Sequence, residues 1–282
     1  MTPIPYHRPS SLEGALRLVQ RLGGARYIAG GTDLLVQMKD HRHEPDALIS
    51  LRAVPELRVL ELDQGARIGA AVPVSELLES PELVGRWPAL ADALREIGSV
   101  QIQNSATLGG NLCNASPAAD STPILLSLGA RVRLAGPGGR RTMDLDAFLV
   151  GPGRTALTEG EILVAIELDE PGPGERSVFF KKTRVAMDLA IVNLGATLRM
   201  EAGVIAEVRL AAGSVGPRAM RLREAEALLL GQGASPELIA RAAAAAQAEV
   251  RPISDVRGSA EYRRAIVGVF VKRALASLVR EA

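Results

Sequence analysis

Two short segments, each built around a pair of adjacent glycines, constrain the fold of this 282-residue chain more than any other feature. The longer one spans residues 100–123 and reads VQIQNSATLGGNLCNASPAADSTP. Adjacent glycines let the backbone approach a ligand closely and adopt positive φ, and consecutive free N–H groups in such a turn bind anions. Residues 121–123 then predict a helix start, with a capping residue and a proline at the first helical position. The pattern indicates a phosphate-binding rim that needs no positive charge.

A second segment, residues 27–35 (YIAGGTDLL), predicts a strand, a tight Gly-Gly turn and the start of a helix. Free N–H groups at the start of a helix favour phosphate. Neither segment is a G-x-G-x-x-G fingerprint or a P-loop, and each one alone is also compatible with an ordinary polar loop. Because the chain carries two such segments, we expect a diphosphate held between two subdomains.

Strand and helix signals divide the chain into three units. Residues 1–55 form a small βαβ unit, whose first helix begins at a capping box of Ser10 and Glu13. Its other predicted elements are a strand at 27–29, a helix at 34–39 and a strand at 47–51. Residues 56–175 mix strands with helices and end near a Pro-Gly-Pro-Gly linker at 171–174. The predicted elements of this second unit are strands at 67–71, 130–134 and 162–168 and helices at 74–78 and 89–97.

Residues 176–282 carry the signals of a separate C-terminal unit. Alternating apolar residues predict an antiparallel sheet, and three helical patterns follow it. The strands are expected at 177–181, 189–200 and 204–212, and the helices at 221–230, 235–250 and 259–279.

The composition excludes several classes of protein. A net charge of +1 gives no electrostatic reason to expect nucleic acid or a membrane surface as a partner. The N-terminus does not read as a signal peptide, and no apolar run approaches the roughly 20 residues that span a bilayer. We therefore expect a soluble, cytoplasmic protein.

Cysteine and histidine are too few for a metal centre. The single cysteine, Cys113, cannot form an internal disulfide or hold an iron–sulfur cluster alone. We favour a small buried filler over a redox thiol at this position. The chain has three histidines, His7, His41 and His43. His41 and His43 would share one face of a strand, but no third ligand is near them in the sequence, so no metal site is predicted.

Residues 29–35 and 107–120 together resemble the FAD-binding subunit of the molybdenum hydroxylases, the family of xanthine dehydrogenases, aldehyde oxidases and carbon monoxide dehydrogenase. The resemblance covers essentially the whole chain, with further similar segments at 161–163, 180–192, 213–226 and 254–264. It implies an α+β fold: a PCMH-type FAD-binding domain of two α/β subdomains, followed by a C-terminal antiparallel sheet with a helical bundle. FAD would lie between the two N-terminal subdomains, with its ring reaching toward the third unit.

The resemblance also implies a set of FAD-binding residues. Asp120 matches an acid that contacts the flavin, although Asp also favours helix starts. Leu163 matches an apolar flavin contact, and it also suits a strand core. Lys181 matches a lysine near the ring, but the spacing to Asp188 is one residue short, so Lys181 and Lys182 compete for this role. The two glycine segments would bind the diphosphate mainly through backbone N–H groups; their residues are Ala29, Gly30, Gly31, Thr32, Asp33, Leu34, Thr107, Leu108, Gly109, Gly110 and Asn111.

Ile97 stands where some members of the family carry an aromatic residue over the flavin, so ring stacking is not implied. No acid–base or nucleophilic catalytic residue is expected. The resemblance places molybdopterin on a large partner subunit and [2Fe–2S] clusters on a small one, usually in a dimer of heterotrimers. FAD would collect electrons from the clusters and pass them to an external acceptor such as NAD⁺, oxygen or a quinone. The alternatives are a self-contained PCMH-type flavin oxidoreductase and a non-enzymatic nucleotide-binding module.

Overall fold

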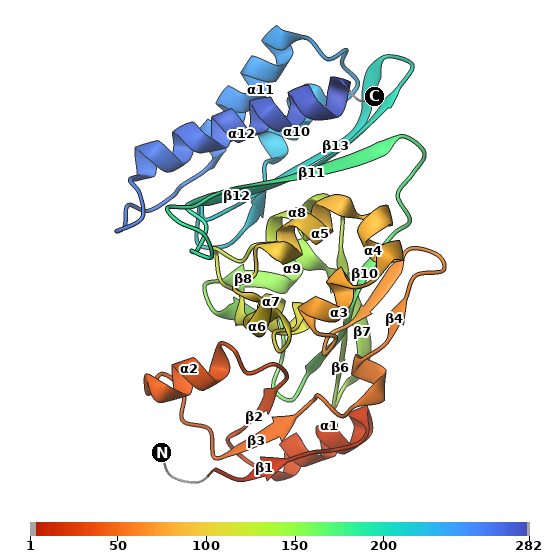
Figure 1. Ribbon diagram of the computed structural model, residues 1–282, viewed down its shortest axis with the longest axis vertical. Coiled ribbons are helices and arrows are strands. Elements are labelled where there is room, and N and C mark those ends of the chain that lie inside the picture. The colour runs from red at the N-terminus through yellow and green to blue at the C-terminus, as the bar shows by residue number, and fades with distance from the viewer. Residues whose placement is uncertain (1–3, 281–282) are drawn as a thin grey trace.

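The computed structural model describes residues 4–280, in which three larger sheets are stacked along the long axis of the molecule and a two-stranded ribbon makes a fourth sheet (Figure 1). The N-terminal sheet lies at one end, and the C-terminal helices lie at the other. The α+β fold expected from the sequence is confirmed: mixed α/β layers precede an antiparallel sheet that carries helices on one face.

The first subdomain is a parallel sheet in the order β1 (Tyr6–His7), β3 (Ala47–Ser50), β2 (Ala25–Ile28). Helix α1 (Leu12–Arg21) packs Leu12 and Ala15 against this sheet, and the short helices α2 (Leu34–Lys39) and η1 (Pro55–Leu57) complete the subdomain. The predicted cap of α1 was wrong by one residue. Ser11, not Ser10, is the N-cap, and its hydroxyl accepts a hydrogen bond from the Gly14 amide at 3.1 Å. Glu13 pairs with Arg17 instead of closing a capping box.

The second subdomain contains a five-stranded antiparallel sheet with β10 at its centre. In spatial order its strands are β4 (Leu60–Glu61), β5 (Ala66–Gly69), β10 (Ile162–Leu168), β6 (Arg131–Gly136) and β7 (Gly139–Asp144). A two-stranded ribbon, β8 (Leu149–Gly151) and β9 (Arg154–Thr155), lies beside it. The predicted strand at 162–168 coincides with β10, whereas β7, rich in arginine and exposed, gave no alternating signal and was missed.

Helices surround this sheet and build the largest core of the molecule around the fully buried Trp87 and Phe148. They are α3 (Val74–Leu78), α4 (Pro81–Arg86), α5 (Pro88–Arg95), α6 (Val100–Gln103), α7 (Leu108–Asn114), α8 (Ser121–Ser127) and α9 (Leu145–Phe148). Helix α8 was predicted to begin with a cap and a proline at its first position. Its capping position is Asp120, which makes no side-chain cap bond, and Pro123 is the third residue of the helix.

The C-terminal sheet is antiparallel, in the order β11 (Glu175–Lys182), β12 (Val192–Glu201), β13 (Val204–Gly213), β14 (Met220–Arg221). Alternate residues of β12 point to opposite faces. Leu194 and Leu198 pack under the helices α10 (Arg223–Leu229), α11 (Pro236–Glu249) and α12 (Ala260–Arg280). Gly195 faces the second subdomain, where a Cβ atom would stand only 2.4 Å from the Ile124 Cα of α8. The C-terminal sheet thus lies directly on α8. Within residues 4–280, no helix combines the length and hydropathy needed to cross a bilayer.

Candidate functional site

A groove runs between the first and second subdomains and consists of two adjoining cavities. The first cavity has a volume of about 940 Å³, and the second has a volume of about 570 Å³. Both are lined by the same six residues where they meet: Arg26, Tyr27, Ala29, Gly110, Cys113 and Gly153. Because residues from both glycine segments are among these six, the two segments face one groove, as the sequence predicts for a ligand held between two subdomains.

The first glycine segment connects β2 to α2, and residues 29–34 all line the second cavity. Gly31 has φ +74°, a left-handed conformation that glycine adopts without strain. Gly30 is required for a different reason. A Cβ atom at Gly30 would lie 2.1 Å from the Ser105 carbonyl oxygen, so only glycine lets this segment approach the second subdomain. Ala29, Thr32, Asp33 and Leu34 extend this wall, and burial raises the pKa of the Asp33 carboxyl.

The second glycine segment differs from the sequence-based expectation, because it is helical. Thr107 is the N-cap of α7, and its hydroxyl accepts a hydrogen bond from the Gly110 amide at 3.0 Å. Neither Gly109 nor Gly110 has positive φ. Gly109 is instead a packing position, where a Cβ atom would lie 2.5 Å from the Ala70 Cβ, whereas Gly110 lines both cavities. The free N–H groups therefore belong to the first turn of a helix rather than to a loop.

The remaining residues of this segment divide between the core and the groove. The Leu108 side chain is completely buried in the core, so only its backbone can serve the groove. Asn111 lines the second cavity, and its Oδ1 accepts a hydrogen bond from the Ser121 hydroxyl at 2.7 Å. This bond joins α7 to the start of α8, where Asp120 lies.

Asp120 lines the second cavity and meets two side chains of the C-terminal sheet. Lys181 Nζ donates to Asp120 Oδ2 at 2.9 Å, and Asn193 Nδ2 donates to Asp120 Oδ1 at 3.3 Å. The Lys181 side chain is 5% exposed, whereas Lys182 is exposed. Of the two lysines that compete in the sequence, Lys181 is the one that contacts Asp120, which lines the second cavity. Burial raises the pKa of Asp120 to about 6, although the Lys181 ammonium acts in the opposite direction.

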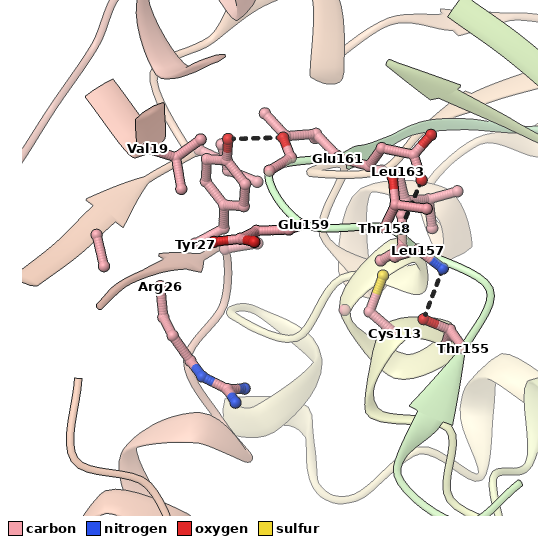
Figure 2. Close-up of a pocket in the computed structure, with 18 of the residues that line it drawn as sticks. Val19, Arg26, Tyr27, Cys113, Thr155, Leu157, Thr158, Glu159, Glu161 and Leu163 are labelled. Carbon is pink, nitrogen blue, oxygen red and sulfur yellow. Dashed lines mark hydrogen bonds between the residues drawn. The ribbon is translucent and has the colours of Figure 1, made fainter. Parts of the chain in front are cut away.

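Leu163 lies in the first cavity and is not brought together with Asp120 and Lys181. Its side chain is buried in the core of the second subdomain, as expected for a strand core, and it also lines the first cavity. The flavin contact stays a prediction. Figure 2 shows the first cavity with Tyr27 on one side and Cys113 and Leu163 on the other. Ile97, at the position that is aromatic in some members of the family, lines the second cavity.

Two hydrogen bonds span the groove, and neither was expected from the sequence. The Tyr27 hydroxyl donates to the Gly160 carbonyl at 3.2 Å, and Gln37 Nε2 donates to Asn114 Oδ1 at 3.0 Å (Figure 2 shows the first). Asn193 was also missed. Its signal was a lone amide between the apolar residues Val192 and Leu194 at the start of a strand, and a buried amide of this kind needs a hydrogen-bond partner.

Cys113 lies where the two cavities meet, and burial raises the pKa of its thiol to about 12. A thiol with this pKa is protonated at neutral pH, which disfavours a redox role. The predicted buried filler is only partly right, because Cys113 packs against the core but is partly buried and lines the groove. His43 lines the second cavity, while His41 pairs with Glu44 at the surface. Within the described residues, 4–280, no group of three or more His, Cys, Asp or Glu side chains is arranged to hold a metal ion.

Comparison with known proteins gives matches to two families along the chain. The FAD binding domain in molybdopterin dehydrogenase matches residues 2–170, and the CO dehydrogenase flavoprotein C-terminal domain matches residues 177–278. The carbon monoxide dehydrogenase medium chain of Hydrogenophaga pseudoflava is 35% identical over 272 residues, which are 96% of this chain and 95% of the relative. The putative xanthine dehydrogenase FAD-binding subunit of Escherichia coli is 33% identical, with 98% and 96% covered.

Solved structures show the same likeness. Carbon monoxide dehydrogenase from Hydrogenophaga pseudoflava has a TM-score of 0.94 and 36% identity to this chain, with 98% of each chain covered. Quinoline 2-oxidoreductase from Pseudomonas putida 86 has a TM-score of 0.92 and 29% identity, with 99% of this chain and 98% of that chain covered.

Proposed function

The chain belongs to the FAD-binding subunits of the molybdenum hydroxylases, and from this membership we propose that it relays electrons inside a multi-subunit dehydrogenase. It is the FAD-binding subunit of an oxidoreductase complex of the carbon monoxide and xanthine dehydrogenase type. In our proposal, its FAD receives electrons from [2Fe–2S] clusters on a small partner subunit and delivers them to an external acceptor. The observation that carries the proposal is the pair of glycine segments facing one groove, with Asp120 and Lys181 at its far end.

The groove fits FAD along its length. The first turn of α7 and the Gly30–Gly31 turn supply N–H groups for the diphosphate near the place where the two cavities meet. Of the three residues that the family resemblance assigns to the flavin, Asp120 and Lys181 lie in or beside the second cavity, whereas Leu163 lies in the first. We assign the isoalloxazine ring to the second cavity, beside Asp120 and Lys181, and this assignment departs from the flavin contact that the resemblance implies for Leu163. The first cavity would then hold the adenosine end, with Leu163 and Tyr27 as apolar contacts.

When bound, FAD supplies the chemistry that accepts electrons one at a time and gives up two together. The chain itself positions and tunes it. The Lys181 ammonium would favour a negative charge on the ring, while the ionised Asp120 carboxylate beside it would oppose that charge. No residue of this chain is assigned to bond breaking in the organic substrate. That reaction belongs, in our proposal, to a molybdopterin-containing large subunit.

The proposed assembly is a dimer of heterotrimers in the cytoplasm. The relatives are named medium chains or FAD-binding subunits of dehydrogenases, which supports a complex of several subunits. The assembly is tested by purifying a tagged chain from its native cells and measuring iron, acid-labile sulfide and molybdenum in the co-purified subunits.

The flavin itself is tested by heating the purified protein and identifying what is released. We expect free FAD, about one per chain, and its reduction when a substrate of the complex is added. A chain that purifies alone, retains covalent flavin and turns over its own substrate would instead support the self-contained flavin oxidoreductase. A native complex without flavin would contradict both.

A further inference from the structure

Three ionisable side chains form a continuous row from solvent to the second cavity. Lys181 Nζ lies 3.3 Å from Glu96 Oε2 on its outer side and 2.9 Å from Asp120 Oδ2 on its inner side. The Glu96 side chain is 46% exposed, whereas the side chains of Lys181 and Asp120 are only 5% and 10% exposed. The row therefore begins at the protein surface and ends at a carboxyl group that lines the cavity we assign to the flavin ring.

The three residues of the row come from three separate elements of the fold. Glu96 is the C-cap of α5, Asp120 precedes α8, and Lys181 lies in β11. Asn193, which pairs with Lys181 in the β11–β12 register, donates from Nδ2 to Asp120 Oδ1 and to the Ala119 carbonyl. On the opposite side of the cavity, the ionisable groups that line it are Arg26, Tyr27, Asp33 and His43, and the Cys113 thiol of α7 lines it as well.

The charge state of Asp120 is finely balanced. Burial disfavours its carboxylate, while Lys181 and Asn193 favour it, and Glu96 adds a weaker repulsion. The outcome is a pKa of about 6, so the group is mostly ionised at neutral pH but close to its midpoint. A further negative charge in the same cavity would raise the pKa of the Asp120 carboxyl, because like charges disfavour the ionised form.

We propose that Asp120 takes up a proton from solvent when the bound flavin is reduced, and that Lys181 and Glu96 connect it to solvent. The proposal rests on the ring lying in the second cavity, as assigned above. Reduction of bound FAD would add two electrons, supplied by the partner's clusters, and one proton, so the cavity would gain one negative charge. A second proton from solvent converts the Asp120 carboxylate to the acid, and the total charge of the cavity stays constant.

Lys181 sets the charge state of Asp120 before the flavin is reduced. Its ammonium keeps Asp120 ionised while the flavin is oxidised, which leaves the carboxylate able to accept a proton later. Without that ammonium, the buried carboxyl would already be protonated at neutral pH and could take up nothing on reduction. Lys181 is therefore a positioning and charge-setting residue, while Asp120 is the group that binds the proton.

The test counts protons through the pH dependence of the flavin midpoint potential, measured by spectroelectrochemistry on FAD-loaded protein. At pH 7, wild-type protein should take up nearly one proton more per two electrons than the Asp120→Asn variant. The proposal is overturned if Asp120→Asn protein that retains FAD shows the same number of protons and the same pH dependence as the wild type.

Lys181→Met and Lys182→Met are a matched pair of neighbouring charge deletions, since only Lys181 contacts Asp120. Lys181→Met should lose the extra proton at pH 7 and regain it at higher pH, while Lys182→Met should behave as wild type. If Asp120→Asn does not retain FAD, this pair decides, and equal proton numbers for the two variants overturn the proposal. Failure of the proposed function itself looks different, because wild-type protein would then contain no FAD to titrate.

Discussion

Gly30 shows how one residue can determine whether two subdomains meet. A Cβ atom there would lie 2.1 Å from the Ser105 carbonyl oxygen and 2.9 Å from the Ala106 Cα, and both are backbone atoms. Backbone cannot rotate away as a flexible side chain would, so the contact is relieved only if the first subdomain moves. The groove between the subdomains is therefore set by the absence of a side chain.

We predict that Gly30→Ala lowers the free energy of unfolding by about 1–3 kcal/mol, the usual cost of overpacking, and reduces the FAD content of the purified protein. Gly85→Ala is the control, because a Cβ atom at Gly85 in α4 meets nothing within 4 Å. That change should leave FAD unchanged and add about 0.5–1 kcal/mol of helix stability. Thermal unfolding and released flavin are measured on both. Full FAD occupancy in Gly30→Ala would contradict the packing argument.

Asp120 also makes a prediction for the flavin-free protein. A carboxyl whose pKa is raised in the folded state to about 6 binds its proton more tightly there than in the unfolded chain. Folding stability from this group is therefore present at low pH and is lost as pH rises through the interval from about 4 to about 6. Between pH 4.5 and pH 7, the free energy of unfolding of wild-type protein should fall by about 2 kcal/mol relative to Asp120→Asn.

Urea unfolding of both proteins at the two pH values measures this difference. The exposed carboxylate Glu79 provides the control, since Glu79→Gln removes a charge without touching the cavity. A wild-type protein that gains stability relative to Asp120→Asn as pH rises would reverse the sign and refute the assignment of burial as the dominant cause.

At the scale of residues, the sequence predicts the types of groups in the groove better than their geometry. Gly30 and Gly110 could be predicted because the chain carries two such segments, although either segment alone is also compatible with an ordinary polar loop. The sequence does not predict which of Lys181 and Lys182 contacts Asp120. That depends on which residue of β11 faces α8 and α5 after the strand pairs with β12. Asn193 was missed for the same reason: its role exists only after Ala119 and Asp120 are placed against it.

At the scale of elements, α7 is the clearest disagreement between local propensity and the fold. Two adjacent glycines each cost roughly 1 kcal/mol in a helix, which favours a loop at residues 109–110. Helix α7 forms nevertheless, because Leu108 and Leu112, one turn apart, are both completely buried and Thr107 caps the first turn. The cap and the apolar spacing were present in the sequence, but the stabilising burial was not visible there. By contrast, α2 and α3 match their predicted bounds, since polar or turn residues bracket a short apolar run.

We predict that Thr107→Ala destabilises the protein by about 1 kcal/mol and also weakens FAD binding about five- to tenfold. The hydroxyl accepts a hydrogen bond from the Gly110 amide and thereby fixes the first turn of α7, where Gly110 lines the groove. Ser235→Ala is the matched control, because Ser235 caps α11 in the same way, through the Leu238 amide at 3.1 Å, far from the groove.

Titration of flavin-free protein with FAD, followed by flavin fluorescence, separates the two effects. Ser235→Ala should lose similar stability and keep its FAD affinity, and Thr107→Ser should restore both properties. Equal losses of affinity in Thr107→Ala and Ser235→Ala would show that general destabilisation, rather than the first turn of α7, explains the weaker binding.

At the scale of the whole molecule, the site requires all three units. The first subdomain supplies residues 29–34, the second supplies α7 and Asp120, and the C-terminal sheet supplies Lys181 and Asn193. The second and third units are joined tightly, with Gly195 and Thr197 of β12 against α8. The first subdomain is joined through a smaller apolar cluster that includes Leu12 and Ile162. The groove therefore opens between the units that are held together less extensively.

Because the first subdomain is joined to the second less extensively than the C-terminal sheet is, we expect bound FAD to reduce motion mainly in the first subdomain. The first subdomain contacts the far wall of the groove through the Tyr27–Gly160 and Gln37–Asn114 hydrogen bonds, and bound FAD would add contacts between the same two walls. We expect removal of FAD to accelerate amide hydrogen exchange in β2 and α2, while β12 and α12 keep their protection. At a free FAD concentration of 100 times the Kd, ligand linkage stabilises the folded state by about 2.7 kcal/mol. Hydrogen exchange read by mass spectrometry tests this on FAD-loaded and flavin-free protein, and equal acceleration in α12 would show that FAD stabilises the molecule as a single unit.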